Sequence, residues 1–193
     1  MVIDQKIDPI SFRKTLMAKS PRALATLEKV SEMADWNGPI AEGRAKGVSF
    51  VEHDSMGTGI CEISLDRSTG KIKVHHFWIA LDAGIIVQPD NVKAQMEGGI
   101  LMGLSSVLKE QITIEDGKVQ QSNFNDYQLL RMEDCPDTIE TSLIESSEDP
   151  VGVGETATPM VAGAIANAFL KLTGKRLRHL PFTPERVLEA LNS

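Results

Sequence analysis

Apolar residues recur at helical spacing in the first part of the chain. They lie three and four positions apart over residues 12–17, after Asp8-Pro9, and again over residues 23–36, after Ser20-Pro21. In both places a side chain that can cap a helix precedes a proline, and proline is favoured at the first helical position. We therefore expect residues 1–42 to form a helical lead-in of two short amphipathic helices that pack against the rest of the chain.

An alternation of apolar and polar residues with a period of two begins at residue 44 and predicts strands. We expect strands over residues 47–52, 59–65, 71–80 and 138–144, a short hairpin over 112–119, and helices over 89–108, 160–172 and 184–191. Helices mixed with antiparallel strands indicate an α+β fold, built of antiparallel hairpins with packed helices. Residues 43–193 are expected to form this main domain.

The predicted helix that begins at Pro89 carries glycines within its apolar stripe. Gly98, Gly99 and Gly103 each destabilise a helix by about 1 kcal/mol relative to alanine. We therefore expect something to approach the helix backbone closely at these positions. Gln95 lies one turn before the first pair of glycines. It is either an exposed helix residue or an amide that donates a hydrogen bond to a ligand.

A glycine-alternating loop, Gly152-Val153-Gly154, presents a single carboxylate, Glu155, ahead of the predicted helix 160–172. Such a loop lets the backbone approach a ligand, and a helix start offers unpaired N–H groups. No Lys-Ser/Thr pair follows the glycines, which excludes a P-loop, and the third glycine of a dinucleotide fingerprint is missing. Glu155 is then either a general base or an acid that only caps the helix.

Composition excludes several classes of function. The net charge of −7 and an aromatic content of only 5% disfavour a nucleic-acid partner. Cys61 and Cys135 have no second ligand at metal-site spacing and are expected to be free thiols in a reducing compartment. His75 and His76 are adjacent on a predicted strand and would point to opposite faces, so no metal site is expected there. No apolar segment reaches the length of a membrane span and no secretory signal is visible, so we expect a cytoplasmic location.

The motifs taken together resemble the C-terminal part of the large subunit of xanthine oxidase-family molybdenum hydroxylases. The similarity is strongest to the branch that includes isoquinoline 1-oxidoreductase beta subunits and bacterial aldehyde oxidoreductases. It covers essentially the whole chain. The segments that carry it include Asp82-Ala83-Gly84, Val87-Gln88-Pro89-Asp90, Ala94 to Gly99, Gln121-Ser122-Asn123-Phe124, Gly152 to Glu155, Ala166-Asn167-Ala168-Phe169 and Thr173 to Arg178.

This resemblance implies a molybdopterin-dependent oxidoreductase that hydroxylates an aldehyde or an N-heterocycle. Glu155 would lie beside the molybdenum and take the proton from the metal-bound hydroxyl group that attacks the substrate carbon. Gln95 would touch the pterin, which the neighbouring glycines would let the helix approach, and Gly152, Val153 and Gly154 would complete the contact. The cofactor would be molybdopterin, with the cytosine dinucleotide form as one option, and iron–sulfur clusters would lie on a separate subunit.

The chain also departs from the family pattern. Thr156 replaces the usual proline after the glutamate, and Ala83 replaces the usual cysteine of the Asp-Cys-Gly turn. The segments that complete the family's molybdenum pocket are absent from these 193 residues. We therefore expect a partner chain, the upstream half of the large subunit, to supply them, and a periplasmic location if that partner carries an export signal. The alternatives are a non-catalytic remnant or accessory module that keeps the fold, and an independent module that binds a small anion.

Overall fold

The computed structural model describes residues 7–193, so residues 1–6 of the predicted lead-in lie outside the described part. Helices α1 (Pro9–Met17) and α2 (Pro21–Met33) open the fold. The Asp8 carboxylate caps α1 by accepting from Ser11 N at 2.7 Å, as expected. Ser20 stands at the N-cap position of α2, but its hydroxyl makes no capping hydrogen bond. Helix α2 ends three residues before the predicted Trp36, because Asp35 adopts a positive φ of 40°.

A four-stranded sheet forms the centre of the molecule. Its strands are β1 (Arg44–Glu52), β2 (Met56–Leu65), β3 (Ile72–Asp82) and β6 (Thr138–Leu143), in the order β1-β2-β3-β6. The first three strands are antiparallel neighbours, which agrees with the predicted hairpins, and the α+β class is confirmed. Strand β6 instead runs parallel to β3. A parallel neighbour requires a long crossover, which the segment containing the third helix provides.

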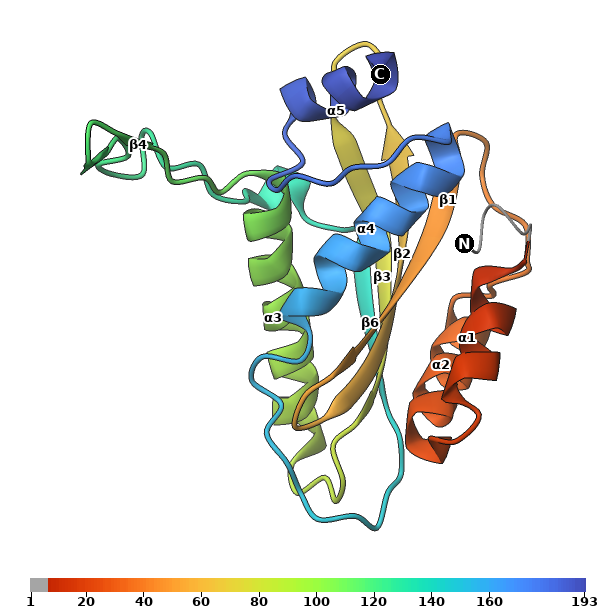
Figure 1. Ribbon diagram of the computed structural model, residues 1–193. Coiled ribbons are helices and arrows are strands. Elements are labelled where there is room, and N and C mark those ends of the chain that lie inside the picture. The colour runs from red at the N-terminus through yellow and green to blue at the C-terminus, as the bar shows by residue number, and fades with distance from the viewer. Residues whose placement is uncertain (1–6) are drawn as a thin grey trace.

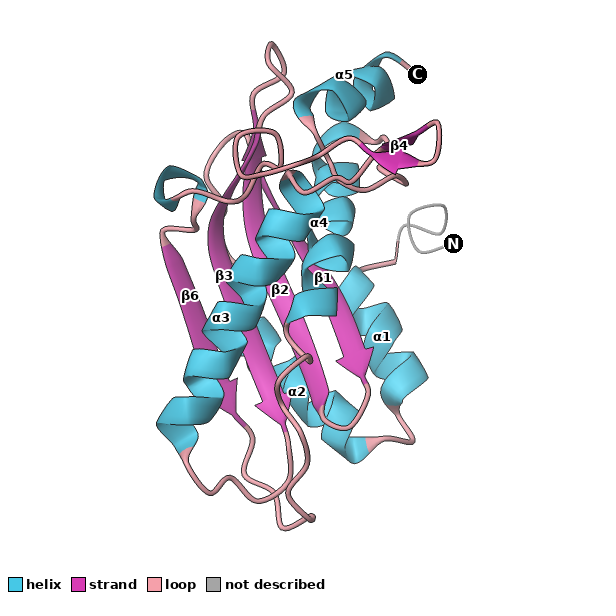
Figure 2. Ribbon diagram, turned by 90° about the vertical axis from the view of Figure 1, so that its left-hand side faces the viewer, coloured by secondary structure: helices cyan, strands magenta, loops and turns pink. Residues whose placement is uncertain are grey.

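Helices cover both faces of this sheet (Figures 1 and 2). Helices α3 (Pro89–Leu108) and α4 (Thr158–Thr173) lie on one face, and α1 and α2 lie on the other. Alternate side chains of each strand point to opposite faces of the sheet. Phe77 of β3 faces the α3–α4 side, whereas the next residue, Trp78, faces α2. Burying each large side chain of this kind stabilises the fold by about 1.5–3 kcal/mol.

The remaining elements lie at the upper end of the sheet in Figure 1. Helix α5 (Pro184–Asn192) packs Val187 into the core. The predicted loop after residue 130 contains a short 3-10 helix, η1 (Met132–Asp134). Strands β4 (Ile114–Glu115) and β5 (Lys118–Val119) form the predicted short hairpin, which projects away from the body of the molecule.

Helices α3 and α4 cross at two of the predicted glycines. A Cβ placed on Gly103 would lie 2.6 Å from Val161 Cγ2, and one on Gly99 would lie 2.9 Å from Ala157 Cβ. At Gly103 the close approach is therefore made by α4 and not by a cofactor, whereas Gly99 both contacts α4 and lines the cavity that contains Gln95. Gly98 differs, since a Cβ there would meet nothing within 4 Å. Only Gly98 of the three leaves open space on the surface of α3.

Candidate functional site

The glycine-alternating loop is held against the end of β3. The backbone N–H of Val151 donates to Ala83 O at 3.1 Å, and that of Ile85 donates to Glu148 O at 2.9 Å. Ala83 is buried in the core, so alanine at the family's cysteine position is accommodated as a small apolar side chain. These contacts fix the loop next to the turn that follows β3.

A partly buried ion pair supports the same turn. The Arg22 guanidinium of α2 binds the Asp82 carboxylate through two hydrogen bonds, of 2.9 Å from Nε and 2.7 Å from Nη2. Asp82 Oδ1 also accepts from Gly84 N at 3.0 Å. The bidentate bond from Arg22 holds the pKa of Asp82 below its usual value. The lead-in helix therefore helps to position the turn that anchors the loop.

Replacing Arg22 with methionine should destabilise the chain by about 2–3 kcal/mol at pH 7, less than for a fully buried pair because the Arg22 side chain is 30% exposed. The folded-state pKa of Asp82 lies below its unfolded value, so this stabilisation is present above the unfolded pKa and is lost as the pH falls through the folded pKa. Urea unfolding should therefore show a difference between wild type and variant that shrinks below roughly pH 4.

Lys14→Met is the matched control, because Lys14 and Glu28 form an exposed pair, which contributes at most about 1 kcal/mol. An Arg22 variant as stable as the Lys14 variant at pH 7 would contradict the role given to the Arg22–Asp82 pair.

Thr156 fastens the acid-bearing loop to the turn between β1 and β2. Its hydroxyl is hydrogen-bonded to the Ser55 hydroxyl, and both residues are buried. Glu155, the preceding residue, is exposed, and its carboxylate makes no hydrogen bond or ion pair with any residue in 7–193. The threonine that replaces the usual proline thus supplies a different restraint, a hydrogen bond, while the carboxylate stays free to meet a ligand.

Glu155, Gln95 and Gly154 line one cavity of about 740 Å³. It lies between α3, the start of α4 and the turn after β1. A Cβ placed on Gly154 would lie 3.9 Å from Gln95 Nε2, which shows how closely the loop passes the amide. Val153 is half-buried against the core and Gly152 is exposed near Asp54, so neither lines the cavity. Three of the five predicted site residues are therefore brought together.

The cavity has further lining residues that sequence reasoning missed. Glu52 and His53 reach it from the end of β1, and Met102 and Ser106 reach it from α3. On α3 the spacing could have identified them, because positions 95, 98, 102 and 106 follow one face of a helix. No local pattern marks Glu52 and His53, because the packing of α4 on β1 brings them to the cavity.

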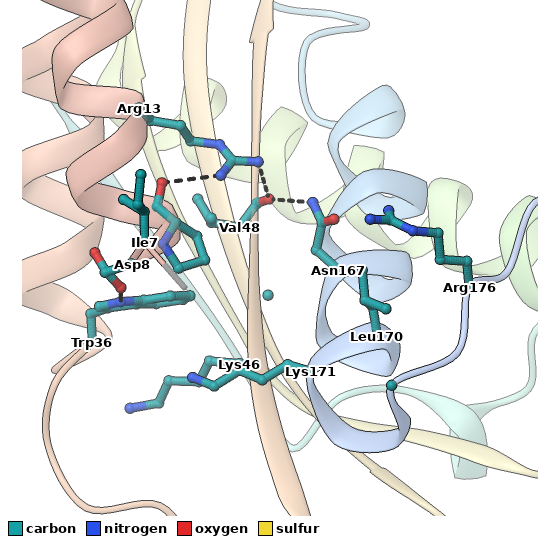
Figure 3. A pocket seen from close by; sticks show the side chains of 13 residues that line it. Ile7, Asp8, Arg13, Trp36, Lys46, Val48, Asn167, Leu170, Lys171 and Arg176 are labelled. Carbon is teal, nitrogen blue, oxygen red and sulfur yellow. Dashed lines mark hydrogen bonds between the residues drawn. The ribbon is translucent and has the colours of Figure 1, made fainter. Parts of the chain in front are cut away.

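A second cavity of about 740 Å³ lies near the other end of α4, between α1, β1 and α4 (Figure 3). Most of its cationic side chains already contact other groups of the protein. Arg13 donates to Pro9 O at 3.1 Å and to Val48 O at 3.4 Å, and burial lowers its pKa. Asn167 donates to the same Val48 O at 2.9 Å, and Lys171 Nζ lies 4.9 Å from the centre of the Trp36 ring. None of the predicted site residues lines this cavity.

The two histidines make separate contacts, as their adjacency on a strand predicts. His75 Nε2 lies 2.8 Å from Ser64 Oγ, and His76 is hydrogen-bonded to the Thr138 hydroxyl. Within residues 7–193, no group of three or more His, Cys, Asp or Glu side chains could hold a metal ion. None of the helices in that range has the length and apolar content needed to cross a membrane.

Comparison with known proteins identifies the family. A family model described as a molybdopterin cofactor-binding domain matches residues 10–136. The isoquinoline 1-oxidoreductase subunit beta of Brevundimonas diminuta is 39% identical over 92% of this chain. Among solved structures, quinoline 2-oxidoreductase from Pseudomonas putida 86 superposes with a TM-score of 0.66 at 24% identity, over 72% of this chain and 19% of its own. The aldehyde oxidoreductase from Desulfovibrio desulfuricans ATCC 27774 gives 0.62 at 31% identity, over 70% of this chain and 15% of its own.

The chain therefore belongs to the xanthine oxidase family of molybdenum hydroxylases and carries their molybdopterin cofactor-binding domain. It spans only part of the length of the curated relatives that it matches, for example 23% of the Brevundimonas diminuta protein and 27% of a membrane-bound aldehyde dehydrogenase from Gluconacetobacter polyoxogenes.

The residues around the first cavity fit a pterin cofactor. The Gln95 side chain lines the cavity, and its amide can both donate and accept a hydrogen bond, as a pterin edge requires. Gly98 leaves the adjacent surface of α3 open, so a flat ring could lie against the helix there. The cavity volume is within the range typical of cofactor sites.

Proposed function

We propose that this chain forms one side of the molybdenum cofactor site of a hydroxylase that oxidises an aldehyde or an N-heterocycle. The observation that carries the proposal is the meeting of Gln95, Gly154 and Glu155 at one cavity, although they come from distant parts of the sequence. Family membership supports the cofactor class. The cytosine dinucleotide form of molybdopterin is part of this proposal.

Each residue has a distinct task in this site. Gln95 hydrogen-bonds the pterin through its amide. Gly154 has no side chain, so its backbone lies near the Gln95 amide without filling the space that the pterin needs. When bound, the cofactor supplies the molybdenum that accepts two electrons from the substrate. Glu155 acts as general base: a carboxylate oxygen takes the proton released when the oxygen nucleophile attacks the substrate carbon. Its exposure and lack of partners within residues 7–193 leave both oxygens able to do so.

The remaining side of the site comes from other chains. This chain spans 23% of the length of its Brevundimonas diminuta relative, so the upstream half of the large subunit is the first partner. An iron–sulfur subunit that accepts the electrons is the second. The assembly is proposed to be cytoplasmic, or periplasmic where a partner carries an export signal.

The proposal is tested with a completed large subunit, in which residues 1–193 replace the matched segment of the Brevundimonas diminuta protein, expressed with an iron–sulfur subunit. We expect about one molybdenum per large subunit by elemental analysis and dye reduction that depends on an aldehyde or an N-heterocycle. A folded, assembled protein with neither molybdenum nor activity would instead favour a non-catalytic module. The 193-residue chain alone should bind no stoichiometric molybdenum.

A further inference from the structure

A hairpin arm, residues 110–130, projects from the end of α3 beyond the body of the molecule (Figure 1). At its centre β4 and β5 pair in antiparallel register, with Ile114 opposite Val119 and Glu115 opposite Lys118. The two turn residues both have positive φ, 48° at Asp116 and 72° at Gly117. This turn geometry matches the right-handed twist of the two strands, so the turn itself favours the hairpin conformation.

One face of the hairpin is apolar and uncovered. Ile114 and Val119 are directly opposite each other, and Ile112 lies two residues before Ile114, so all three are expected on the same face. Their exposed fractions lie between 53% and 68%. Glu115 and Lys118 occupy the other face. A two-stranded hairpin is at best marginally stable in water, and an exposed apolar patch of this kind marks an interaction site.

A second apolar group is displayed by the turn that follows the hairpin. The Asp126 carboxylate accepts from the backbone N–H groups of Ser122 and Asn123, each at 2.9 Å. These bonds hold the pKa of Asp126 below its usual value and fix the turn. Phe124 stands in this turn with 66% of its surface exposed. An aromatic side chain on a preorganised turn is typical of an anchor at a protein interface.

The base of the arm is fastened beside the cofactor cavity. The Tyr127 hydroxyl donates to Glu110 Oε2 at 2.8 Å, and Leu130 N donates to Ser105 Oγ at 3.0 Å. Ser106, which lines the cavity, donates to Glu110 at 3.4 Å. The arm is therefore anchored to the last turn of the helix that carries Gln95.

We propose that the hairpin arm docks its apolar face and Phe124 into an apolar groove on the first partner, the upstream half of the large subunit, and so holds the two sides of the cofactor site together. This inference rests on the proposed function. The length of the relative favours that occupant, since the Brevundimonas diminuta protein is about four times as long as this chain. The apolar face carries no charged side chain, which matches an apolar surface rather than a nucleic acid or an ionic partner.

Amide hydrogen exchange of residues 111–125 tests the inference, compared between the 193-residue chain alone and the completed large subunit. We expect exchange to slow by at least about tenfold on completion. The double variant Ile114→Ser/Val119→Ser should lose this protection. The matched control Glu115→Ser/Lys118→Ser, on the opposite face, should keep it. Phe124→Ala should reduce it.

Equal exchange rates in the two proteins would overturn the arm's docking. Protection that appears in the 193-residue chain alone, with a concentration-dependent dimer, would also overturn it, because the occupant would then be a second copy. Molybdenum content and turnover are measured on the same samples. Protection without molybdenum supports the docking of the arm and contradicts the proposed function. Bound molybdenum with an unprotected arm contradicts the docking of the arm and supports the proposed function.

Discussion

Glu155→Gln should lower turnover per bound molybdenum by about 100- to 10,000-fold in the completed large subunit, the range typical of a lost general base. Glutamine keeps the size of the side chain but cannot accept the proton at its amide. Because Glu155 is exposed and makes no hydrogen bond within residues 7–193, its replacement should leave folding unchanged. Steady-state dye reduction, normalised to molybdenum content, measures the effect.

Glu52 provides the matched control, because its side chain lines the same cavity from β1. Glu52→Gln should retain turnover within a few-fold of wild type. A large loss in the Glu52 variant together with normal turnover in the Glu155 variant would move the base to Glu52. Normal turnover in both variants would show that neither of these two carboxylates acts as the general base.

Gly103→Leu should destabilise the chain by about 3 kcal/mol or more, because overpacking of this kind displaces backbone as well as side chains. The first added carbon would already lie 2.6 Å from Val161 Cγ2 and 2.8 Å from the carbonyl oxygen of Thr158. Separating α3 from α4 would also move Gln95 away from Glu155, since each side chain lies on or next to one of these helices. Urea unfolding of the 193-residue chain measures the loss.

Gly98→Leu is the matched control on the same helix. A Cβ there meets nothing within 4 Å, and leucine favours a helix over glycine by somewhat less than about 1 kcal/mol. This variant should therefore be as stable as wild type or slightly more stable. Equal destabilisation by the two substitutions would show that helix propensity, and not the crossing of α3 and α4, controls this region.

Local sequence patterns predicted most of the elements because each has its own start and stop signal. The short hairpin expected over residues 112–119 is present as β4–β5, and the helix expected over residues 160–172 is present as α4, which ends at Gly174 with φ 73°. The parallel pairing of β6 had no such signal. It depends on a crossover of more than fifty residues between Asp82 and Thr138, and alternation alone does not reveal which neighbour a strand takes.

The site was also predicted only in part, because local patterns do not reveal contacts between distant segments of the chain. Glu155 and Gln95 stood out through their glycine-rich surroundings and the family resemblance, and they line one cavity. The glycines of α3 were correctly identified as a place of close approach, but sequence could not distinguish a neighbouring helix from a cofactor. Gly103 packs against α4, Gly99 contacts α4 and also lines the cavity, and a Cβ at Gly98 would meet open space. Glu52 and His53 were missed because the packing of α4 on β1, two elements far apart in the sequence, brings them to the cavity.

Molybdenum content of the completed large subunit carrying Gly98→Phe tests the central claim most directly. Gly98 lines the proposed cofactor cavity and a Cβ there meets nothing within 4 Å, so the phenylalanine side chain is expected to extend into the cavity. Glu97→Phe, at the adjacent exposed position outside the cavity, is its control. We predict a folded Gly98 variant with little or no molybdenum and a Glu97 variant with the wild-type amount. Full molybdenum occupancy in the Gly98 variant would contradict the placement of the cofactor in this cavity.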